Sequence, residues 1–134
     1  MILLLLLQLA SPDFAVTPGL VRGLDQHTVC TIKWGKDARH VTEAMKRQVA
    51  KNYHMSRTDI KARGKGTCCE IDHKIPREIG GADDISNLWA QPWLEAQKKD
   101  VEENKWHRNV CSGVVTLAEA QDHFMHWGEK VELK

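Results

Sequence analysis

The sequence predicts an α+β fold whose core is two short strands followed by a helix, with further helices flanking it. The first strand is predicted at residues 69–72, where side chains alternate, and the second at residues 87–91, between a Gly-Gly loop and a proline. The helix follows at residues 94–110, a stretch rich in Lys, Glu and Gln that contains neither glycine nor proline. At 134 residues, the chain is long enough for one domain with a modest core of its own.

Flanking helices are predicted on both sides of this core. Thr42 is a good N-cap, and the apolar residues after it recur at helical spacing, which predicts a helix from about residue 43 to residue 53. Further upstream, residues 29–34 are compatible with either a short strand or a helical turn. Near the C-terminus, Thr116 and Glu119 have the spacing of a capping box, and the apolar stripe after them predicts a last helix.

The first ten residues, MILLLLLQLA, are apolar but too short to span a bilayer. They are typical of the hydrophobic region of a secretory signal, with small residues suited to cleavage at Ala10 and Ala15. We therefore expect a leader at residues 1–16, a single domain at residues 17–134, and a periplasmic or secreted protein without a membrane segment after leader removal. A buried N-terminal strand in a cytoplasmic protein is the alternative.

The four cysteines are Cys30, Cys68, Cys69 and Cys111, and they form no Cys-x-x-Cys pair of the kind that holds structural zinc. If the protein is exported, disulfides are expected. A bridge between Cys30 and Cys111 would close a long loop and contribute about 4 kcal/mol in the chain-entropy model. The adjacent Cys68 and Cys69 are not expected to bridge each other. Four buried thiols are the alternative.

Positive charge is concentrated in one segment. The formal net charge is only +1, which by itself does not indicate a nucleic-acid-binding protein. Residues 46–65 nevertheless contain seven Lys or Arg side chains and one Asp, a local charge of +6. Such a segment can bind phosphates, and we expect Lys61, Arg63 and Lys65 to contact nucleic acid. A solvated helix face and loop is the alternative.

The most informative segment is residues 70–93, EIDHKIPREIGGADDISNLWAQPW. It places Asp72 beside His73, continues with a Gly-Gly pair, and reaches Asn87 fourteen positions after the histidine. A carboxylate can hold a hard divalent cation and a neutral imidazole can take a proton from water, so the two together suit metal-assisted hydrolysis. Taken alone, an Asp-His pair is also compatible with a strand-end cap or a salt bridge.

The order Asp-His, Ile-Pro, Gly-Gly and Asn-Leu-Trp resembles the HNH nuclease family, whose ββα-metal site is built from two strands and a helix. The resemblance implies an endonuclease that hydrolyses phosphodiester bonds in DNA with low sequence specificity. It implies that Asp72 is a metal ligand, that His73 is the general base, and that Asn87 holds the imidazole or the loop through hydrogen bonds. It also implies one divalent metal ion, Mg, Mn, Ni or Zn, as the cofactor. Similarity over most of the remaining chain extends to small bacterial and phage-like HNH proteins.

The sequence departs from the family at the third position of the site. The family places a His or Asn metal ligand on the helix, nine to ten residues after the asparagine, where this chain has Ala96 and Gln97. Gln97 is therefore the expected helix ligand, with Glu95 or Asp100 as substitutes, or else the metal site is weakened. A weakened site would suit a nucleic-acid-binding protein that keeps the fold. A secreted nuclease toxin with an immunity partner is a further alternative.

Overall fold

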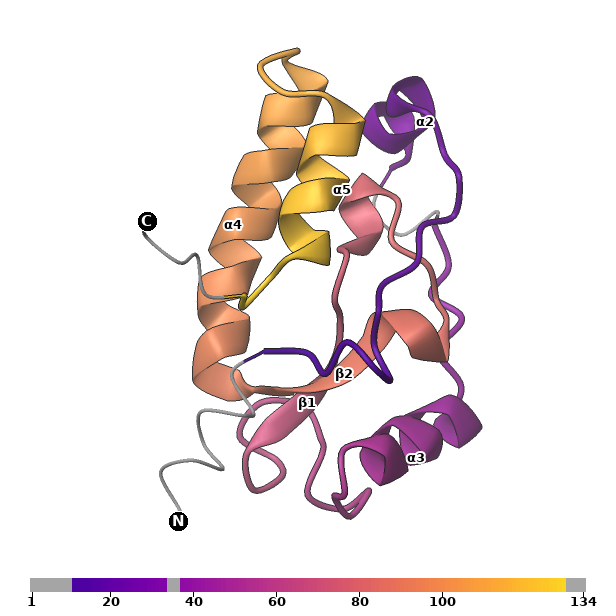
Figure 1. The fold of residues 1–134 in the computed structure, drawn as a ribbon, viewed down its shortest axis with the longest axis vertical. Coiled ribbons are helices and arrows are strands. Elements are labelled where there is room, and N and C mark those ends of the chain that lie inside the picture. Colours follow the sequence, from indigo (N-terminus) through magenta and orange to yellow (C-terminus); the bar gives the residue numbers. More distant parts are fainter. Residues whose placement is uncertain (1–10, 34–36, 130–134) are drawn as a thin grey trace.

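The computed structural model describes residues 11–33 and 37–129. Along the chain the elements are α2 (Gln26–Thr31), α3 (Glu43–Asn52), β1 (Cys69–His73), the 3-10 turns η1 (Arg77–Ile79) and η2 (Ile85–Asn87), β2 (Leu88–Pro92), α4 (Trp93–Cys111) and α5 (Leu117–Met125). The hairpin of β1 and β2 lies between α3 on one side and the pair of α4 and α5 on the other (Figure 1). The predicted α+β class, with two strands followed by a long helix, is confirmed.

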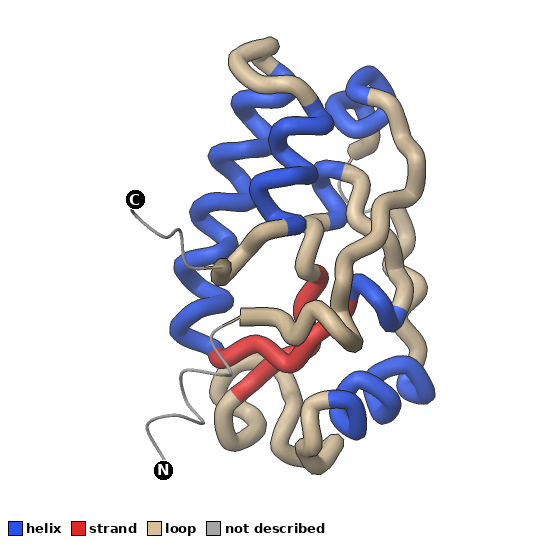
Figure 2. Tube along the Cα trace, in the orientation of Figure 1, coloured by secondary structure: helices blue, strands red, loops and turns tan. Residues whose placement is uncertain are grey.

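β1 and β2 pair antiparallel, with His73 opposite Leu88. Both predicted strands are present with ends displaced by one residue, because β1 continues to His73 and β2 begins after Asn87, which ends η2. Pro92 is the last residue of β2 and occupies the N-cap position of α4. A proline is tolerated there because its missing N–H falls at a strand end. The hairpin therefore runs into α4 without a loop, as the tube in Figure 2 shows.

α4 and α5 pack side by side and share a core with the loop between the strands (Figure 1). The predicted capping box is confirmed, since the Thr116 side chain accepts a hydrogen bond from the Glu119 backbone and the Glu119 side chain accepts one from Thr116. The fully buried members of this core are Ile75, Ile79, Val110, Ala120 and Phe124. This core fixes the long loop between β1 and β2 against both helices.

α3 covers the opposite side of the hairpin. Its predicted N-cap is confirmed, because the Thr42 side chain accepts a hydrogen bond from the Met45 backbone. A second, smaller core lies beneath it and consists of Ala50, Ile60, Cys69 and Ala90. Through Ile60, the segment between α3 and β1 therefore packs against the hairpin.

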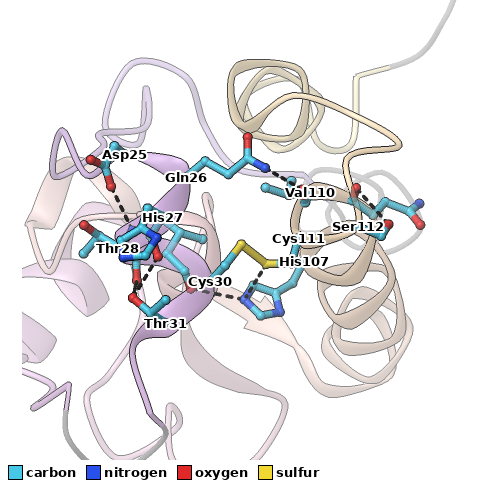
Figure 3. Close-up of a disulfide and its surroundings, with 12 residues drawn as sticks. Asp25, Gln26, His27, Thr28, Cys30, Thr31, His107, Val110, Cys111 and Ser112 are labelled. Atoms are coloured by element: carbon cyan, nitrogen blue, oxygen red, sulfur yellow. Dashed lines mark hydrogen bonds between the residues drawn. A yellow bond between two sulfur atoms is a disulfide. The ribbon is translucent and has the colours of Figure 1, made fainter.

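Of residues 29–34, for which strand and helical turn were both open, residues 29–31 form the end of α2, which runs from Gln26 to Thr31, and Trp34 lies outside the described residues. Asp25 is the N-cap, and its carboxylate accepts a hydrogen bond from the Thr28 backbone at 2.8 Å. A disulfide joins Cys30 of α2 to Cys111 at the end of α4, across a sequence separation of 81 residues (Figure 3). The predicted bridge between these cysteines is confirmed, and it ties the N-terminal part of the chain to the long helix.

A second disulfide joins Cys68 and Cys69, which were not expected to bridge each other. Their Cα atoms are 3.7 Å apart. Cys68 lies in a bend just before β1, so the alternation that would point neighbouring side chains of a strand in opposite directions does not apply to it. No free thiol remains among the described residues.

The start of the described chain packs on the domain. Thr17 is completely buried, and its hydroxyl donates to the Leu88 carbonyl at 3.0 Å and bonds the Tyr53 hydroxyl at 2.6 Å. The Tyr53 hydroxyl also accepts a hydrogen bond from the Asp13 backbone. The expected leader falls mostly on residues 1–10, which lie outside the described residues, so it stays a prediction. Of the helices that the structure describes, none is long and apolar enough to cross a membrane.

Candidate active site

The loop between the strands is held by Asn87, which is completely buried. Its side-chain oxygen accepts a hydrogen bond from the Ile75 backbone at 3.0 Å, and its amide donates to the carbonyls of Ile75 and Ala82 at 3.0 Å each. The close turn also needs Gly81, because a Cβ there would lie 1.7 Å from the Ile75 carbonyl oxygen. The Asn and Gly of the motif therefore shape the loop that faces the end of β1.

His73, the last residue of β1, points toward this loop and bonds Asp83. The Nε2 atom of His73 lies 2.7 Å from Oδ1 of Asp83, and both side chains are about nine-tenths buried, with 9% and 10% exposed. Asp83 also accepts hydrogen bonds from the Arg77 guanidinium at 2.9 Å and from the His40 backbone at 2.7 Å. Because a carboxylate only accepts, the bond assigns the proton of a neutral His73 to Nε2. Nδ1 then carries the lone pair, and no described residue hydrogen-bonds it.

The electrostatics of the pair favour a neutral imidazole beside a charged carboxylate. Burial lowers the pKa of His73, and the neighbouring carboxylates of Asp83 and Asp72 offset part of that effect. Burial works to raise the pKa of Asp83, but the hydrogen bonds from His40 and His73 and the charge of Arg77 outweigh it, so that pKa is lowered. At neutral pH, His73 is therefore free to accept a proton, and Asp83 can stabilise the imidazolium that results.

Asp72 points to the other face of β1 and meets Lys99 of α4. The Lys99 ammonium donates to Oδ2 of Asp72 at 2.9 Å, to the His73 carbonyl at 2.7 Å and to Oε1 of Glu103 at 2.6 Å. Lys99 is only 1% exposed. Burial works against its charge, but the two carboxylates outweigh it and raise the pKa of Lys99. Burial also raises the pKa of Glu103 to about 7, although Lys99 opposes that rise.

The expected metal ligands do not come together. Gln97 is exposed, and two residues along an α-helix correspond to about 200° of rotation, so Gln97 faces away from the side on which Lys99 meets Asp72. The substitutes are also engaged elsewhere: the Glu95 carboxylate pairs with Lys98, and the Asp100 carboxylate pairs with Arg63. The structure therefore does not bring Gln97 to Asp72, and Gln97 as a metal ligand stays a prediction.

With the Lys99 ammonium in place, a divalent cation does not fit beside Asp72. In the part of the chain that the structure describes, no group of three or more His, Cys, Asp and Glu side chains is arranged to hold a metal ion. One oxygen of Asp72 is bound by an ammonium, and the helix residue one turn before Lys99 on the same face is Ala96, which has no ligand atom. The cation that Asp72 contacts in this structure is the Lys99 ammonium.

A basic cleft of about 230 Å³ lies between α3 and β1. Its lining residues are Arg39, Lys46, Arg57, Ile60, Lys61, Ala62, Glu70 and Ile71. The positive charge of Arg39, which lines the cleft, acts to lower the pKa of His73.

The residues expected to bind nucleic acid differ in whether their charges are already paired with carboxylates of the protein. Lys61 is exposed and lines the cleft, and Lys65 is exposed on the turn before β1. The Arg63 guanidinium instead bonds the carboxylates of Glu70 and Asp100 at 2.8 and 2.7 Å. Lys61 and Lys65 are therefore available to a phosphate, whereas Arg63 mainly joins β1 to α4.

Two residues of this site were not anticipated in their present roles: Lys99 and Asp83. Lys99 carried a usable signal, because Ala96, Lys99, Glu103 and Val110 recur at helical spacing and mark the buried face of α4. Asp83 lies within the motif, but its distance in sequence from His73 did not mark it as the partner of the imidazole. From the sequence, the loop at residues 37–40 could either reach the site or be held by salt bridges, and Asp37 pairs with Arg22 and Arg77.

Residues 57–90 match the family model described as HNH endonuclease. The match confirms the resemblance and indicates nuclease activity and nucleic-acid binding in general. The matched segment includes Asp72, His73, Asp83 and Asn87 and ends before α4. No match was found among curated proteins, and none among solved structures.

Proposed function

We propose that the protein is an endonuclease that hydrolyses phosphodiester bonds in DNA with low sequence specificity. The observation that carries the proposal is the hydrogen bond between His73 and Asp83 at the end of β1, within the segment that matches the HNH endonuclease family. An imidazole with a carboxylate on one nitrogen and a free lone pair on the other is the arrangement that a general base requires.

In the proposed reaction a water molecule gives its proton to Nδ1 of His73 while its oxygen attacks phosphorus. The phosphorus–oxygen bond on the opposite side breaks, and the leaving oxygen takes a proton from solvent. Asp83 stabilises the imidazolium while the reaction proceeds, and Asn87 holds the loop that carries Asp83 in place. Asn87 thus acts as a positioning residue rather than as a proton donor or acceptor.

The basic cleft is the proposed site of the DNA backbone. Arg39, Lys46 and Lys61 line it, and no described carboxylate forms an ion pair with any of the three. Positive side chains along a phosphate chain give binding that is largely independent of sequence and that weakens as salt increases. We propose that Lys61 and Lys65 contact phosphates and that Arg63 contributes mainly by its position between the carboxylates of Glu70 and Asp100.

HNH nucleases generally use a divalent metal ion. For this chain one such ion on Asp72 and Gln97 is a prediction from the sequence, and the donors present around Asp72 do not fit it. The reaction steps proposed above therefore involve only protein groups and water.

The test is nicking of supercoiled plasmid, followed on a gel, with EDTA or with added Mg²⁺, Mn²⁺, Ni²⁺ or Zn²⁺. The wild type should nick, and His73→Ala should lower the rate by a factor of about 100 or more, because general-base catalysis contributes about that much. His126→Ala is the matched control, since His126 is exposed on the last turn after α5. Equal rates for His73→Ala and the wild type would exclude His73 as the base.

A second candidate function is binding of nucleic acid without cleavage. The observation that favours it is the ammonium of Lys99 on Asp72, the residue that the family uses for its metal ion. In that case the plasmid would be bound, as seen by a gel shift, but would remain supercoiled under every ionic condition.

We further propose export to the periplasm or the medium, supported by the leader-like N-terminus and by the disulfide between Cys30 and Cys111. A nuclease released in this way would have to be neutralised in the cell that makes it, so an immunity protein is the proposed partner. Fractionation of producing cells, with detection of the mature N-terminus by mass spectrometry, tests the location. A protein found only in the cytoplasm with its leader intact would contradict it.

A further inference from the structure

We propose that Lys99 is a resident cation that fills a divalent-cation site formed by Asp72, Glu103 and the His73 carbonyl, and so excludes a metal ion from it. The ion-binding part of this inference stands independently, whereas its consequence for cleavage rests on the proposed nuclease function.

The geometry around the ammonium is that of an ion in an oxygen cage. Lys99 has three N–H donors, and each reaches one oxygen, on Asp72, on the His73 backbone and on Glu103, at 2.6 to 2.9 Å. The aromatic rings of Phe124 and Trp127 lie on its flank, with centroids 5.3 and 6.0 Å from the ammonium. Every hydrogen of the ammonium is thus used inside the protein.

The cage also has the charge of a cation site. The Lys99 side chain is 1% exposed, and those of Asp72 and Glu103 are 18% and 17% exposed, so two carboxylates converge with little help from water. Without the ammonium, two acidic side chains and a carbonyl oxygen would remain directed at one position. That is a hard oxygen donor set, of the kind preferred by Mg²⁺ and Mn²⁺.

Lys99 and a divalent ion cannot share this position, because both are cations that require the same oxygens at close range. The ion would have to displace the ammonium into a part of α4 that is packed against α5 and the hairpin. Apart from Glu103, the face of α4 toward Asp72 offers no further ligand one turn earlier, where the residue is Ala96. Lys99 therefore prevents a divalent ion from solution from binding to these oxygens.

Lys99 also connects this site to the proposed base. Its hydrogen bond to the His73 carbonyl fixes the last residue of β1 against α4, while the His73 ring points to Asp83. Because Lys99 is almost completely buried, it does not contact substrate. It is a positioning residue that holds the end of β1 against α4.

Binding of Mn²⁺, measured by loss of the free-ion EPR signal, tests the inference directly. The wild type should show no stoichiometric binding, and Lys99→Ala should bind one Mn²⁺ per chain. Adding Asp72→Asn or Glu103→Gln to Lys99→Ala should remove that binding. Lys98→Ala is the matched control, since Lys98 is the exposed neighbour on the same helix, and it should behave as the wild type does.

The wild type alone also decides the question if Lys99→Ala does not fold. One Mn²⁺ bound to the wild type and lost in Asp72→Asn would overturn the inference. Plasmid nicking that persists in EDTA supports it, whereas nicking that stops in EDTA and returns with Mg²⁺ overturns it. Absence of nicking under every condition would refute the proposed nuclease function, and the Mn²⁺ measurements would still decide the role of Lys99.

Discussion

The disulfide between Cys30 and Cys111 should be the largest single contribution of a covalent link to the stability of this protein. The bridge closes a loop of 81 residues, from α2 to the end of α4. In the chain-entropy model, a loop of this length removes enough freedom from the unfolded chain to stabilise the folded state by about 4.5 kcal/mol. Domains of this size have free energies of unfolding of about 5–15 kcal/mol, so the bridge is a large part of the total.

The perturbation is the double variant Cys30→Ser and Cys111→Ser, compared with the wild type in urea unfolding at neutral pH. The free energy of unfolding should fall by about 4 kcal/mol, with a similar dependence on urea. Reduction of the double variant with dithiothreitol then isolates what the Cys68–Cys69 bridge contributes. That bridge joins adjacent residues and closes almost no loop, so its reduction should change stability far less.

A loss below about 1 kcal/mol in the double variant would refute the reasoning, because the entropy of a long closed loop would then be absent. The loss of stability would also be small if the unfolded double variant kept α2 close to α4. In that case the slope of the free energy of unfolding against urea would differ between the double variant and the wild type, because this slope reports the surface exposed on unfolding.

Three further predictions concern the loop, a buried acid and the cleft. Asn87→Ala should lower the free energy of unfolding by about 3 kcal/mol in urea, because the loop groups that its side chain bonds, including the backbone of Ile75, would be left buried without partners. A loss below about 1 kcal/mol would show that water replaces them. Glu78→Gln should raise the midpoint of thermal unfolding at pH 8 but not at pH 4. Burial raises the pKa of Glu78 above its ordinary value, so the folded state favours the protonated acid and loses stability as pH rises through that pKa. An equal effect of this variant at both pH values would contradict the assignment. Lys61→Ala should weaken DNA binding in fluorescence anisotropy and reduce the salt slope by about 1, as expected for one lost phosphate contact. The same change at Lys33, which is exposed after α2, is the control and should leave the slope unchanged.

Local interactions made the helices predictable. Thr42 and Thr116 cap helices through bonds to residues three positions away, so the signal lies within a few letters of sequence. Residues 29–34 were left open between strand and helical turn because so short a segment has too few apolar positions to distinguish the two. The bridge between Cys30 and Cys111 could be proposed from the number of cysteines and an exported setting, but its partners meet only because α2 packs on α4.

The candidate site was less predictable because neighbours in a strand point to opposite faces. Asp72 and His73 are adjacent in sequence, and this adjacency suggested one shared site. In the structure Asp72 bonds Lys99, 27 positions away, whereas His73 bonds Asp83, 10 positions away. The partner of each side chain is therefore set by tertiary packing, which the motif alone does not encode.

Ala96 and Lys99 on α4 act together on the charge balance around Asp72. Ala96 and Lys99 lie one turn apart on the helix face toward Asp72, where the family is expected to place a ligand. If Ala96 were present without Lys99, the carboxylates of Asp72 and Glu103 would face each other across a poorly hydrated space. Such an arrangement is costly for two like charges. A lysine one turn later is long enough to reach both carboxylates and supplies the missing positive charge. A ligand substituted at position 96 without removal of Lys99 should therefore not restore metal binding: Ala96→His should bind no Mn²⁺, whereas Ala96→His combined with Lys99→Ala should bind it. Stoichiometric binding by Ala96→His alone would show that the ammonium yields to a metal ion and that only the absent ligand had prevented binding.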